Sequence, residues 1–391
     1  MVFDFDSRYI LITLRQAQGD INKNTRRDKI KSCIEHNLIS INMEQAMKGR
    51  GSQIQVKNRF LSNEYTVEHI EGVDVPFLEN DKTQYIAEHP KKIVNKVFSS
   101  SVPFRYSMNP YQGCEHGCIY CYARESHQYW GYGAGLDFER KIIYKPEAPQ
   151  LLEKQFNTKK WEVSPIMLSG NTDCYQPIER KLQLTRELLK VCLKYKHPVS
   201  IITKNSLIQR DIDILTPLAQ LNLVHVSLSI TSFDNKLRSV MEPRTASVEK
   251  KLSILSLLSK NKIPTNVMVA PIIPGLNSHE IPTIVKKVAE LGALSVGYTT
   301  VRLNGEIAEI FENWIRTTYP DRTDKVLNQI REINNGNLYS KGKNRLKLHG
   351  ETSFMIKNMF KVARQKYLKG RSLPEYDLDA FCRPNQQLSL F

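Results

Sequence analysis

Six short apolar runs, separated by segments of helical periodicity, limit most narrowly how this chain can fold. The runs are rich in β-branched or other apolar residues and lie at 104–108, 166–169, 199–203, 223–230, 265–272 and 295–303. Between them, apolar side chains recur on one helical face, most clearly within 182–195 and 247–260. Strands that alternate with helices in this way predict right-handed βαβ units and a parallel sheet.

The number of units separates closed from open architectures. Six units are fewer than the eight of a closed barrel, so periodicity alone leaves an open barrel and a doubly wound sheet as alternatives. In both, the loops after the carboxyl ends of the strands carry the chemistry. Two helix boundaries are less marked, because Pro217 limits a helix near 212–218 and Ser278 is an N-cap candidate without a capping box.

Composition divides the rest of the chain. We expect residues 1–46 to be a disordered extension or an overlong start, since Met43 and Met47 are alternative starts. Residues 47–100 are expected to pack on a core of 101–305, and 306–391 to form a helical, basic extension. No apolar run is long enough to span a bilayer, and no signal-peptide cleavage site follows the first residues. Both observations favour a cytoplasmic protein that does not bind a membrane.

The net charge of +16 favours a polyanionic partner, nucleic acid above all, although a generally basic surface is the simpler alternative. Ten of the 31 residues from Lys341 to Arg371 are Lys or Arg, and one is acidic. Within this tract a helix near 352–370 is expected to place Met355, Ile356, Met359 and Val362 on one face. Its basic face can meet phosphates, remain solvated or lie on a membrane surface, and nucleic acid is preferred.

The sequence "YQGCEHGCIYCYAR" at 111–124 places three cysteines just after the first predicted strand. In a reducing compartment such thiols are metal ligands before they are disulfides. Three thiolates on an iron–sulfur cubane leave one iron without a protein ligand. A catalytic metal centre needs such an open coordination position. A zinc site that recruits His116 or His127 as a fourth ligand is the minority alternative.

The spacing CxxxCxxC, with Tyr120 before the last cysteine and a βα series after it, resembles the radical SAM superfamily. Further motifs, among them "KGRGSQIQVKNRF", "GNTDCYQPIER" and "MEPRTAS", are similar to the spore photoproduct lyase-like, or DNA repair photolyase-like, group over roughly residues 47 to 370. The resemblance implies an open, TIM-like (β/α)6 barrel. It also implies that Cys114, Cys118 and Cys121 hold a [4Fe–4S] cluster.

The same resemblance implies the reaction. The open iron would chelate S-adenosylmethionine (SAM), and an electron from a reductant such as flavodoxin or ferredoxin would cleave it to methionine and a 5′-deoxyadenosyl radical. This radical abstracts hydrogen from a substrate, while the protein orients the cofactors and excludes water. Nucleic acid is the preferred substrate. The alternatives are a protein, peptide or small metabolite, and a zinc-stabilised nucleic-acid-binding module without catalysis.

The resemblance also suggests residues at the strand ends that bind the cofactor: Tyr120, Gly170, Thr172, Asp173, Lys204, Ser229 and Arg244. Each has a simpler alternative. Thr172 and Asp173 can merely turn the chain or cap a helix, Lys204 can be solvated rather than paired with the SAM carboxylate, and Arg244 can pair with Glu242 on the surface.

Two residues are candidates for substrate chemistry. Cys174 is either a hydrogen donor or a small buried hydrophobic residue, and the second interpretation is favoured. Tyr122 points away from Tyr120 and is a candidate to face the substrate. The aromatic segment at 126–141 offers Tyr129, Trp130 and Tyr132 for stacking on a base, or for burial against the barrel.

Overall fold

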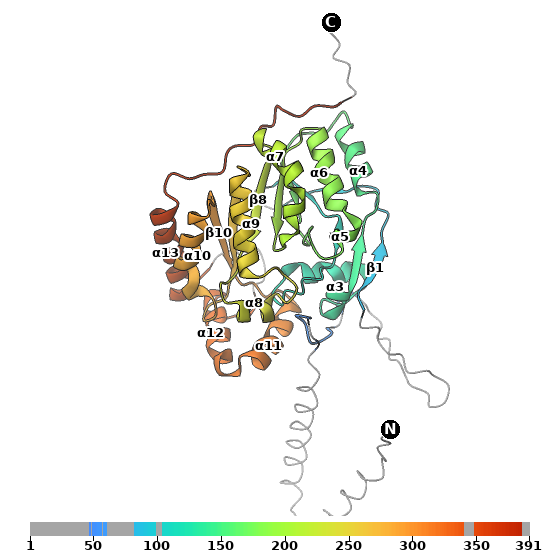
Figure 1. Ribbon diagram of the computed structural model, residues 1–391. Helices are drawn as coiled ribbons and strands as arrows, with labels where there is room; N and C mark the ends of the chain where they lie inside the picture. Colours follow the sequence, from blue (N-terminus) through green and yellow to red (C-terminus); the bar gives the residue numbers. More distant parts are fainter. Residues whose placement is uncertain are drawn as a thin grey trace, which may run out of the picture. The chain divides into compact units, whose positions relative to one another are not determined.

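The computed structural model describes residues 47, 49–56, 58–60, 82–98, 104–339 and 348–384. The chain divides into two compact units, Met1–Lys48 and Gly49–Phe391. The extension predicted for residues 1–46 lies outside the described residues. The elements below all belong to the second unit (Figure 1).

A seven-stranded sheet forms the centre of this unit. Its strand order is β10 (Ser295–Thr300), β9 (Thr265–Ile272), β8 (Val224–Ser229), β7 (Val199–Thr203), β6 (Ile166–Leu168), β3 (Tyr106–Met108) and β2 (Val94–Lys96). Every neighbouring pair is parallel except β2 and β3. Among the described strands β10 and β2 stand at the two edges, so the sheet does not close. The prediction of six parallel strands in an open barrel is confirmed.

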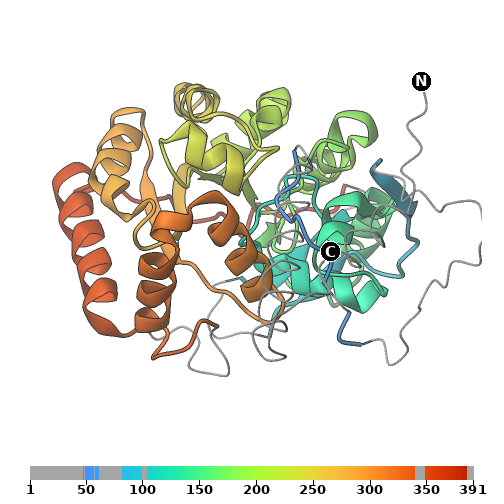
Figure 2. The same ribbon diagram turned by 90° about the horizontal axis from the view of Figure 1, so that it is seen from below.

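Helices follow the parallel strands along the chain and form an arc around the sheet (Figure 2). They are α4 (Ala148–Phe156), α5 (Glu179–Leu182), α6 (Leu184–Lys194), α7 (Ile212–Gln220), α8 (Asn235–Met241), α9 (Val248–Lys260), α10 (Ile281–Glu290) and α11 (Ile307–Thr318). The apolar faces of α4, α6, α7, α9 and α10 pack on the strands in one large core, whereas α8 and α11 pack with the cysteine loop in a second cluster. Pro217 lies inside α7 without ending it. Ser278 begins a short 3-10 helix, η3 (Ser278–Glu280), and does not cap α10.

A second, three-stranded sheet lies beside the cysteine loop. It consists of β1 (Gln84–Ala87), β5 (Lys141–Tyr144) and β4 (Tyr111–Gln112). Between β4 and β5 the chain forms the cysteine loop, the 3-10 helix η1 (Tyr122–Trp130) and the short helix α3 (Leu136–Arg140). The loop therefore leaves β4 and is braced by a sheet that the sequence did not reveal.

The carboxyl-terminal helices are η4 (Pro320–Arg322), α12 (Thr323–Ile333) and α13 (Gly350–Tyr367). Helix α13 confirms the predicted helix, but its packed face differs from the predicted one. Ile356, Phe360 and Ala363 are buried, whereas Met355 is 48% and Val362 61% exposed. The buried stripe is rotated by one residue because α13 docks on α10 and α12, whose positions the periodicity of α13 cannot encode.

Candidate functional site

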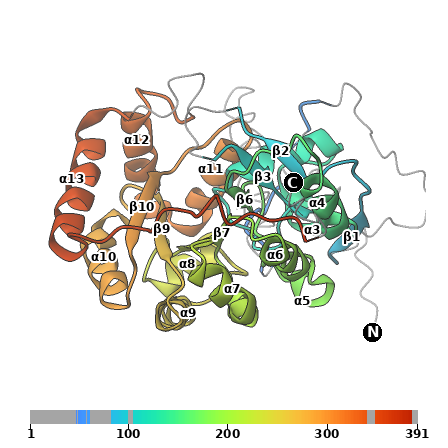
Figure 3. The ribbon, with the colours of Figure 1, turned by 90° about the horizontal axis from the view of Figure 1, so that it is seen from above.

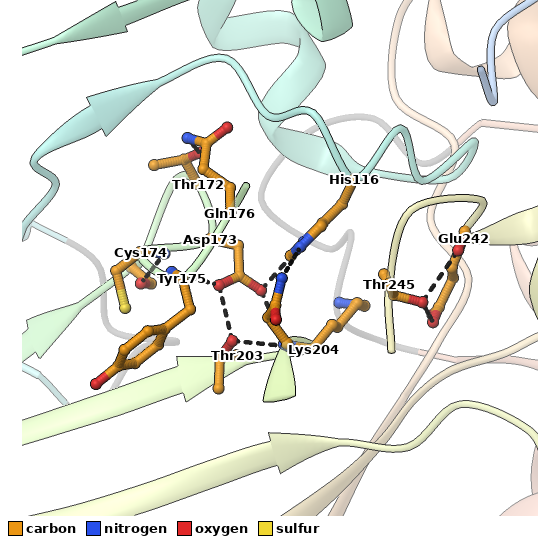
Figure 4. A network of polar contacts seen from close by, with 12 residues as sticks. His116, Thr172, Asp173, Cys174, Tyr175, Gln176, Thr203, Lys204, Glu242 and Thr245 are labelled. Atoms are coloured by element: carbon orange, nitrogen blue, oxygen red, sulfur yellow. Dashed lines mark hydrogen bonds and ion pairs between the residues drawn. The ribbon is translucent and has the colours of Figure 1, made fainter. Parts of the chain in front are cut away.

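The cysteine loop occupies the carboxyl ends of the parallel strands, beside the loops that follow β6 and β7 (Figure 4). Gly113 and Gly117 adopt positive φ angles of 76° and 66°, which L side chains rarely adopt, and they let the loop curl tightly. The N–H of Cys114 donates to the carbonyl of Phe138 at 2.8 Å, and that of Cys121 to the carbonyl of Cys118 at 3.3 Å. The backbone thus fixes where the three thiols emerge.

The three thiols share one desolvated environment. Cys114 and Cys118 are 7% and 6% exposed. Burial raises the pKa of the Cys118 and Cys121 thiols, and the neighbouring thiols raise both further. Iron ions supply the positive charge that buried thiolates need, so this donor set fits an iron–sulfur cluster.

The placement of the other metal-binding side chains bears on the zinc alternative. Within the described ranges, no group of three or more His, Cys, Asp or Glu side chains is placed to hold one metal ion. His116 makes other contacts, described below, and His127 packs between Tyr132 and Phe138 with its pKa lowered to about 4 by burial. His116 lies against the Cys114 thiol, but within the described ranges neither histidine joins two of the cysteines in a group that could hold one metal ion.

Lys204 directly follows β7, and its side chain lies between Asp173 and Glu242 in Figure 4. Burial lowers its pKa, but the Cys118 thiol and the Glu242 carboxylate raise it, and the net pKa lies above the ordinary value. Its Nζ lies 6.0 Å from the centre of the Tyr120 ring. Within the described part of the chain no carboxylate lies at ion-pair distance from Nζ. Among the described residues, the Lys204 ammonium therefore faces the cysteine thiols with no carboxylate in direct contact.

The Asp173 carboxylate is occupied by this chain's own donors. Oδ1 accepts from Thr203 at 2.8 Å and from the N–H of Tyr175 at 2.9 Å, and Oδ2 accepts from the N–H of Lys204 at 2.8 Å. His116 Nδ1 lies 3.3 Å from Oδ2. Burial raises the pKa of Asp173, but His116 and these N–H groups lower it to about 2. Asp173 therefore ties β7 to the cysteine loop, which agrees with its turn-forming alternative.

His116 pairs with Asp173 and with a cysteine of the loop. Burial lowers the pKa of His116, but the Asp173 carboxylate and the Cys114 thiol raise it to about 10. The amide nitrogen of Asn205 lies 3.0 Å from His116 Nε2, and Asn205 Oδ1 accepts from the N–H of Leu207 at 3.0 Å. The pair of His116 and Asp173 therefore positions the cysteine loop against the strand ends.

Thr172 and Gly170 also serve the cysteine loop. Thr172 donates its hydroxyl to the carbonyl of Gly113 at 2.6 Å. The carbonyl of Gly170 accepts from the Tyr122 hydroxyl, while the Tyr122 side chain is 60% exposed. A Cβ at Gly170 would meet nothing closer than 3.7 Å, so close approach within this chain does not require glycine there.

Tyr120 and Glu242 form a buried polar cluster that the sequence did not predict. Glu242 accepts from the Tyr120 hydroxyl, from Thr231 at 2.6 Å and from Lys251 Nζ at 3.0 Å. Lys251 is 1% exposed on α9. Glu242 is therefore not the partner of Arg244 in a surface pair, and that interpretation is wrong. A lysine within a helix gives no sequence signal that a buried carboxylate lies opposite.

The three remaining predicted residues lie in three different environments. Ser229 is 2% exposed at the carboxyl end of β8, on the side of the site. Arg244 donates from Nε to the carbonyl of Gly49 at 2.9 Å and lies 3.6 Å from Glu115. Cys174 is fully buried in the main core, and burial raises its pKa well above the ordinary value. Its position supports the packing interpretation over that of a hydrogen donor.

Comparisons with known proteins agree with this architecture. The sequence profile of the Radical SAM superfamily matches residues 108–288. An uncharacterized protein of Mycobacterium tuberculosis is 29% identical over 234 residues, which cover 59% of this chain and 69% of that protein. An uncharacterized protein of Methanocaldococcus jannaschii is 29% identical over 251 residues, or 64% of this chain and 89% of the relative.

Solved structures of spore photoproduct lyase share the fold. One, complexed with dinucleoside spore photoproduct, superposes with a TM-score of 0.54 at 16% identity, over 77% of this chain and 86% of that one. Another, a variant with bound AdoMet and dinucleoside spore photoproduct, gives 0.53 at 15% identity, over 73% and 79%. No helix among the described residues is long and apolar enough to cross a membrane.

The matched region contains β3, the cysteine loop and the βα units as far as α10, so the family profile and the site's geometry cover the same residues. This agreement favours an enzyme over the alternative in which the chain is a zinc-stabilised nucleic-acid-binding module without catalysis. Residues 108–288 match the radical SAM superfamily, and this match supports a radical SAM enzyme.

Proposed function

We propose that this enzyme acts on nucleic acid, with Cys114, Cys118 and Cys121 as ligands of a [4Fe–4S] cluster and Lys204 as the ligand of the SAM carboxylate. The observation that carries the cofactor part is the Lys204 ammonium, which faces the cysteine thiols with no carboxylate at ion-pair distance in the described part of the chain. When bound, the cluster and SAM together supply a radical that abstracts hydrogen from the substrate.

The other strand-end residues have supporting roles in this proposal. Tyr120 lies under the Lys204 ammonium and is anchored by Glu242, so it limits where the ammonium can move. Ser229 offers a hydroxyl at the next strand end for the ribose or methionyl part of SAM. Thr172 and Asp173 hold the loop, and contribute to SAM binding by keeping the Lys204 backbone in place.

Nucleic acid is supported by charge and by exposed aromatic rings. Tyr129 and Trp130, in the segment that follows Cys121, are 73% and 38% exposed, and Tyr129 stacks on Phe60 at 4.7 Å beside Arg59. Exposed rings next to cations suit bases and phosphates of a single strand. The net charge of +16 is consistent with this partner. The described similar enzyme binds a dinucleoside photoproduct, which is the same chemical class.

The decisive experiment is anaerobic reconstitution with iron and sulfide, reduction by dithionite and addition of SAM. We expect a brown protein with about four irons per chain, and release of 5′-deoxyadenosine. Cys118→Ala should abolish both. Mass spectrometry should then detect deuterium transfer between SAM and DNA or RNA, with affinity that falls steeply as salt rises, because phosphate contacts release counterions.

Two results would contradict parts of the proposal. A reconstituted protein that takes up no cluster would overturn the cofactor assignment. A protein that cleaves SAM, yet binds nucleic acid neither at low nor at high salt and labels peptides or metabolites instead, would move the substrate to the alternative class.

A further inference from the structure

We infer that residues Gly49–Ser52, gripped by the buried Glu139 carboxylate, position the cysteine loop for cluster binding. The inference rests on the proposed cluster site, and it gives the motif "KGRGS" a role. We call Arg50, Gly51, Ser52, Arg124 and Glu139 the loop clamp. These residues come from the amino-terminal segment, from η1 and from α3, yet their contacts converge on Glu139.

Glu139 is the centre of the loop clamp and is fully buried. Its Oε2 accepts from the N–H of Gly51 at 3.1 Å, and its Oε1 accepts from the N–H of Ser52 at 2.8 Å. Arg124 Nη2 donates to Oε1 at 2.5 Å. Two backbone donors and one guanidinium satisfy a carboxylate that burial would otherwise disfavour strongly. Glutamine at this position would keep the shape and lose the charge.

Arg124 connects Glu139 to the backbone of the predicted cluster ligands. It is fully buried, and its Nε donates to the carbonyl of Cys118 at 3.0 Å. Its Nη1 donates to the carbonyls of Ala134 and Gly135 at 3.0 and 2.9 Å. The guanidinium therefore joins the backbone of a predicted ligand to Glu139 and to the segment before α3.

Gly51 lies directly against the cysteine loop. A Cβ at Gly51 would overlap the carbonyl oxygen of Gly117 and reach Ile119 Cγ2 at 3.0 Å. Gly117 itself has a φ of +66°, and a Cβ there would lie 2.8 Å from Glu139 Oε2. Gly51 does not adopt a positive φ, so alanine there would act by contact and not by backbone strain. The backbone at Gly117 would have to move.

Arg244 adds a second tie from the loop after α8. Its N–H donates to the carbonyl of His116 at 3.4 Å, and its Nε donates to the carbonyl of Gly49 at 2.9 Å. The amino-terminal segment is thus bonded to the loop from both sides. Three contacts reach the backbone between His116 and Cys118: the N–H of Arg244 at the carbonyl of His116, Gly51 against the carbonyl of Gly117, and Arg124 Nε at the carbonyl of Cys118. These contacts restrain the spacing of the predicted cluster ligands.

The test compares four full-length proteins: the unchanged chain, Gly51→Ala, Glu139→Gln and the control Gly336→Ala. Gly336 has a φ of +87° and no neighbour within 4 Å, so alanine there strains the backbone far from the loop clamp. Hydrogen exchange is first measured on the cluster-free proteins. We expect amides of residues 114–123 to exchange at least tenfold faster in Gly51→Ala and Glu139→Gln, and at the unchanged rate in Gly336→Ala.

The second readout is the cluster. After reconstitution, we expect iron per folded chain to fall by at least half in both clamp variants, with a changed EPR signal of the reduced protein. Unchanged exchange of the loop in both variants would overturn the inference. If the unchanged chain takes up no iron, the proposed function fails, while the exchange data still decide the role of the loop clamp.

A milder variant covers the case in which both clamp variants fold poorly. Arg50→Met keeps Gly51 and the carboxylate, and removes the donation from Arg50 Nη1 to the carbonyl of Glu139 at 2.8 Å. We expect an intermediate increase in loop exchange, about threefold, with thermal unfolding close to that of the unchanged chain. A global loss of protection without a local maximum at residues 114–123 would contradict a positioning role.

Discussion

Two segments pack on opposite ends of the barrel, one beside the cysteine loop and the other on the scaffold. Gly49–Ser52 lies at the carboxyl ends of the strands, where its backbone and Arg50 contact Glu139. The segment 368–384 crosses the amino ends, from α10 to α4, as Figure 3 shows. Both use hydrogen bonds to backbone groups. The first holds a loop that carries chemistry, whereas the second holds scaffold elements together.

The contacts of the carboxyl-terminal segment explain this difference. Arg371 donates to the carbonyls of Ala289 and Ala293 at 2.7 and 3.2 Å, before β10. Farther along, Tyr376 packs on His225 with ring centroids 4.0 Å apart, and Phe381 packs on Phe156 at 5.8 Å. These contacts join the bases of β10 and β8 to α4 and α10. None of them reaches the cysteine loop.

Ending the chain at Gly370 should have the largest effect on stability. The truncation removes partly buried aromatic rings and several backbone hydrogen bonds, which together are worth about 3–6 kcal/mol. We expect the melting temperature to fall by about 5–15 °C, while iron per folded chain stays unchanged. Calorimetry and iron analysis test this.

The matched control is a chain that ends at Pro384, which keeps every described contact of the segment. It should melt like the unchanged chain. Loss of cluster content in the shorter chain, at a temperature where it is folded, would show that the two ends of the barrel are not independent.

Acid should weaken the amino-end contacts through His197. Trp161 Nε1 donates to His197 Nε2 at 3.2 Å, so Nδ1 carries the proton and donates to the carbonyl of Pro198 at 3.0 Å. Burial lowers the pKa of His197 from 6.5 to about 4. The neutral His197 therefore contributes fully to the free energy of unfolding above pH 6.5, and this contribution is lost as the pH falls from 6.5 to 4. We expect the free energy of unfolding to decrease by roughly 3 kcal/mol over this range, measured by denaturant unfolding.

His197→Phe is the control for this prediction. It removes the acceptor for Trp161 at every pH, so its cost is constant, and the loss between pH 6.5 and 4 should shrink by the amount attributed to His197. The same pH dependence in both proteins would assign the acid sensitivity to other groups.

Lys204→Met tests the opposite end of the barrel. We expect SAM affinity to fall about 10- to 100-fold, or roughly 1.4–3 kcal/mol, because a charged partner of the carboxylate is lost. Iron content should stay near that of the unchanged chain. Calorimetric titration of SAM into anaerobic protein measures this, with Lys190→Met, an exposed residue of α6 paired with Glu187 at 2.7 Å, as the control. Loss of the cluster with unchanged SAM affinity would assign Lys204 to the thiolates instead.

The sequence predicted the open barrel and the place of the cysteine loop because both follow from short-range patterns. Apolar runs give strands wherever they are buried on both faces, and the spacing of Cys114, Cys118 and Cys121 lies within eight residues. The loop clamp was not predictable. Glu139 stands in "LDFERK", which has the composition of a solvated helix, and only the fold brings it to Gly51, 88 residues away.

Roles within the predicted site were harder to predict for the same reason. Asp173 and Thr172 occur in the expected place, but a sequence cannot show that their oxygens are already satisfied by Thr203 and Gly113. Likewise, Cys174 directly follows Asp173 and yet points into the core. Side-chain direction after a strand depends on the turn that follows, and local composition does not determine it.

The smallest expected effect concerns the two tyrosines that flank Cys121. The Tyr122 hydroxyl donates to the carbonyl of Gly170 from an exposed position, where water can replace it. Tyr122→Phe should therefore change the free energy of unfolding by less than about 0.5 kcal/mol, with unchanged iron content. Tyr120→Phe should cost about 1–3 kcal/mol, because it leaves the buried Glu242 carboxylate short of one donor.

Denaturant unfolding of both variants, with and without the cluster, measures this difference. If Tyr122 only braces the loop, Tyr122→Phe should also leave product formation unchanged. A variant that folds, binds its cluster and cleaves SAM normally, yet transfers deuterium to nucleic acid more slowly, would instead place the Tyr122 hydroxyl against the substrate. If both variants lose the same free energy of unfolding, the Tyr122 side chain is buried and not exposed, and its hydroxyl is not replaced by water.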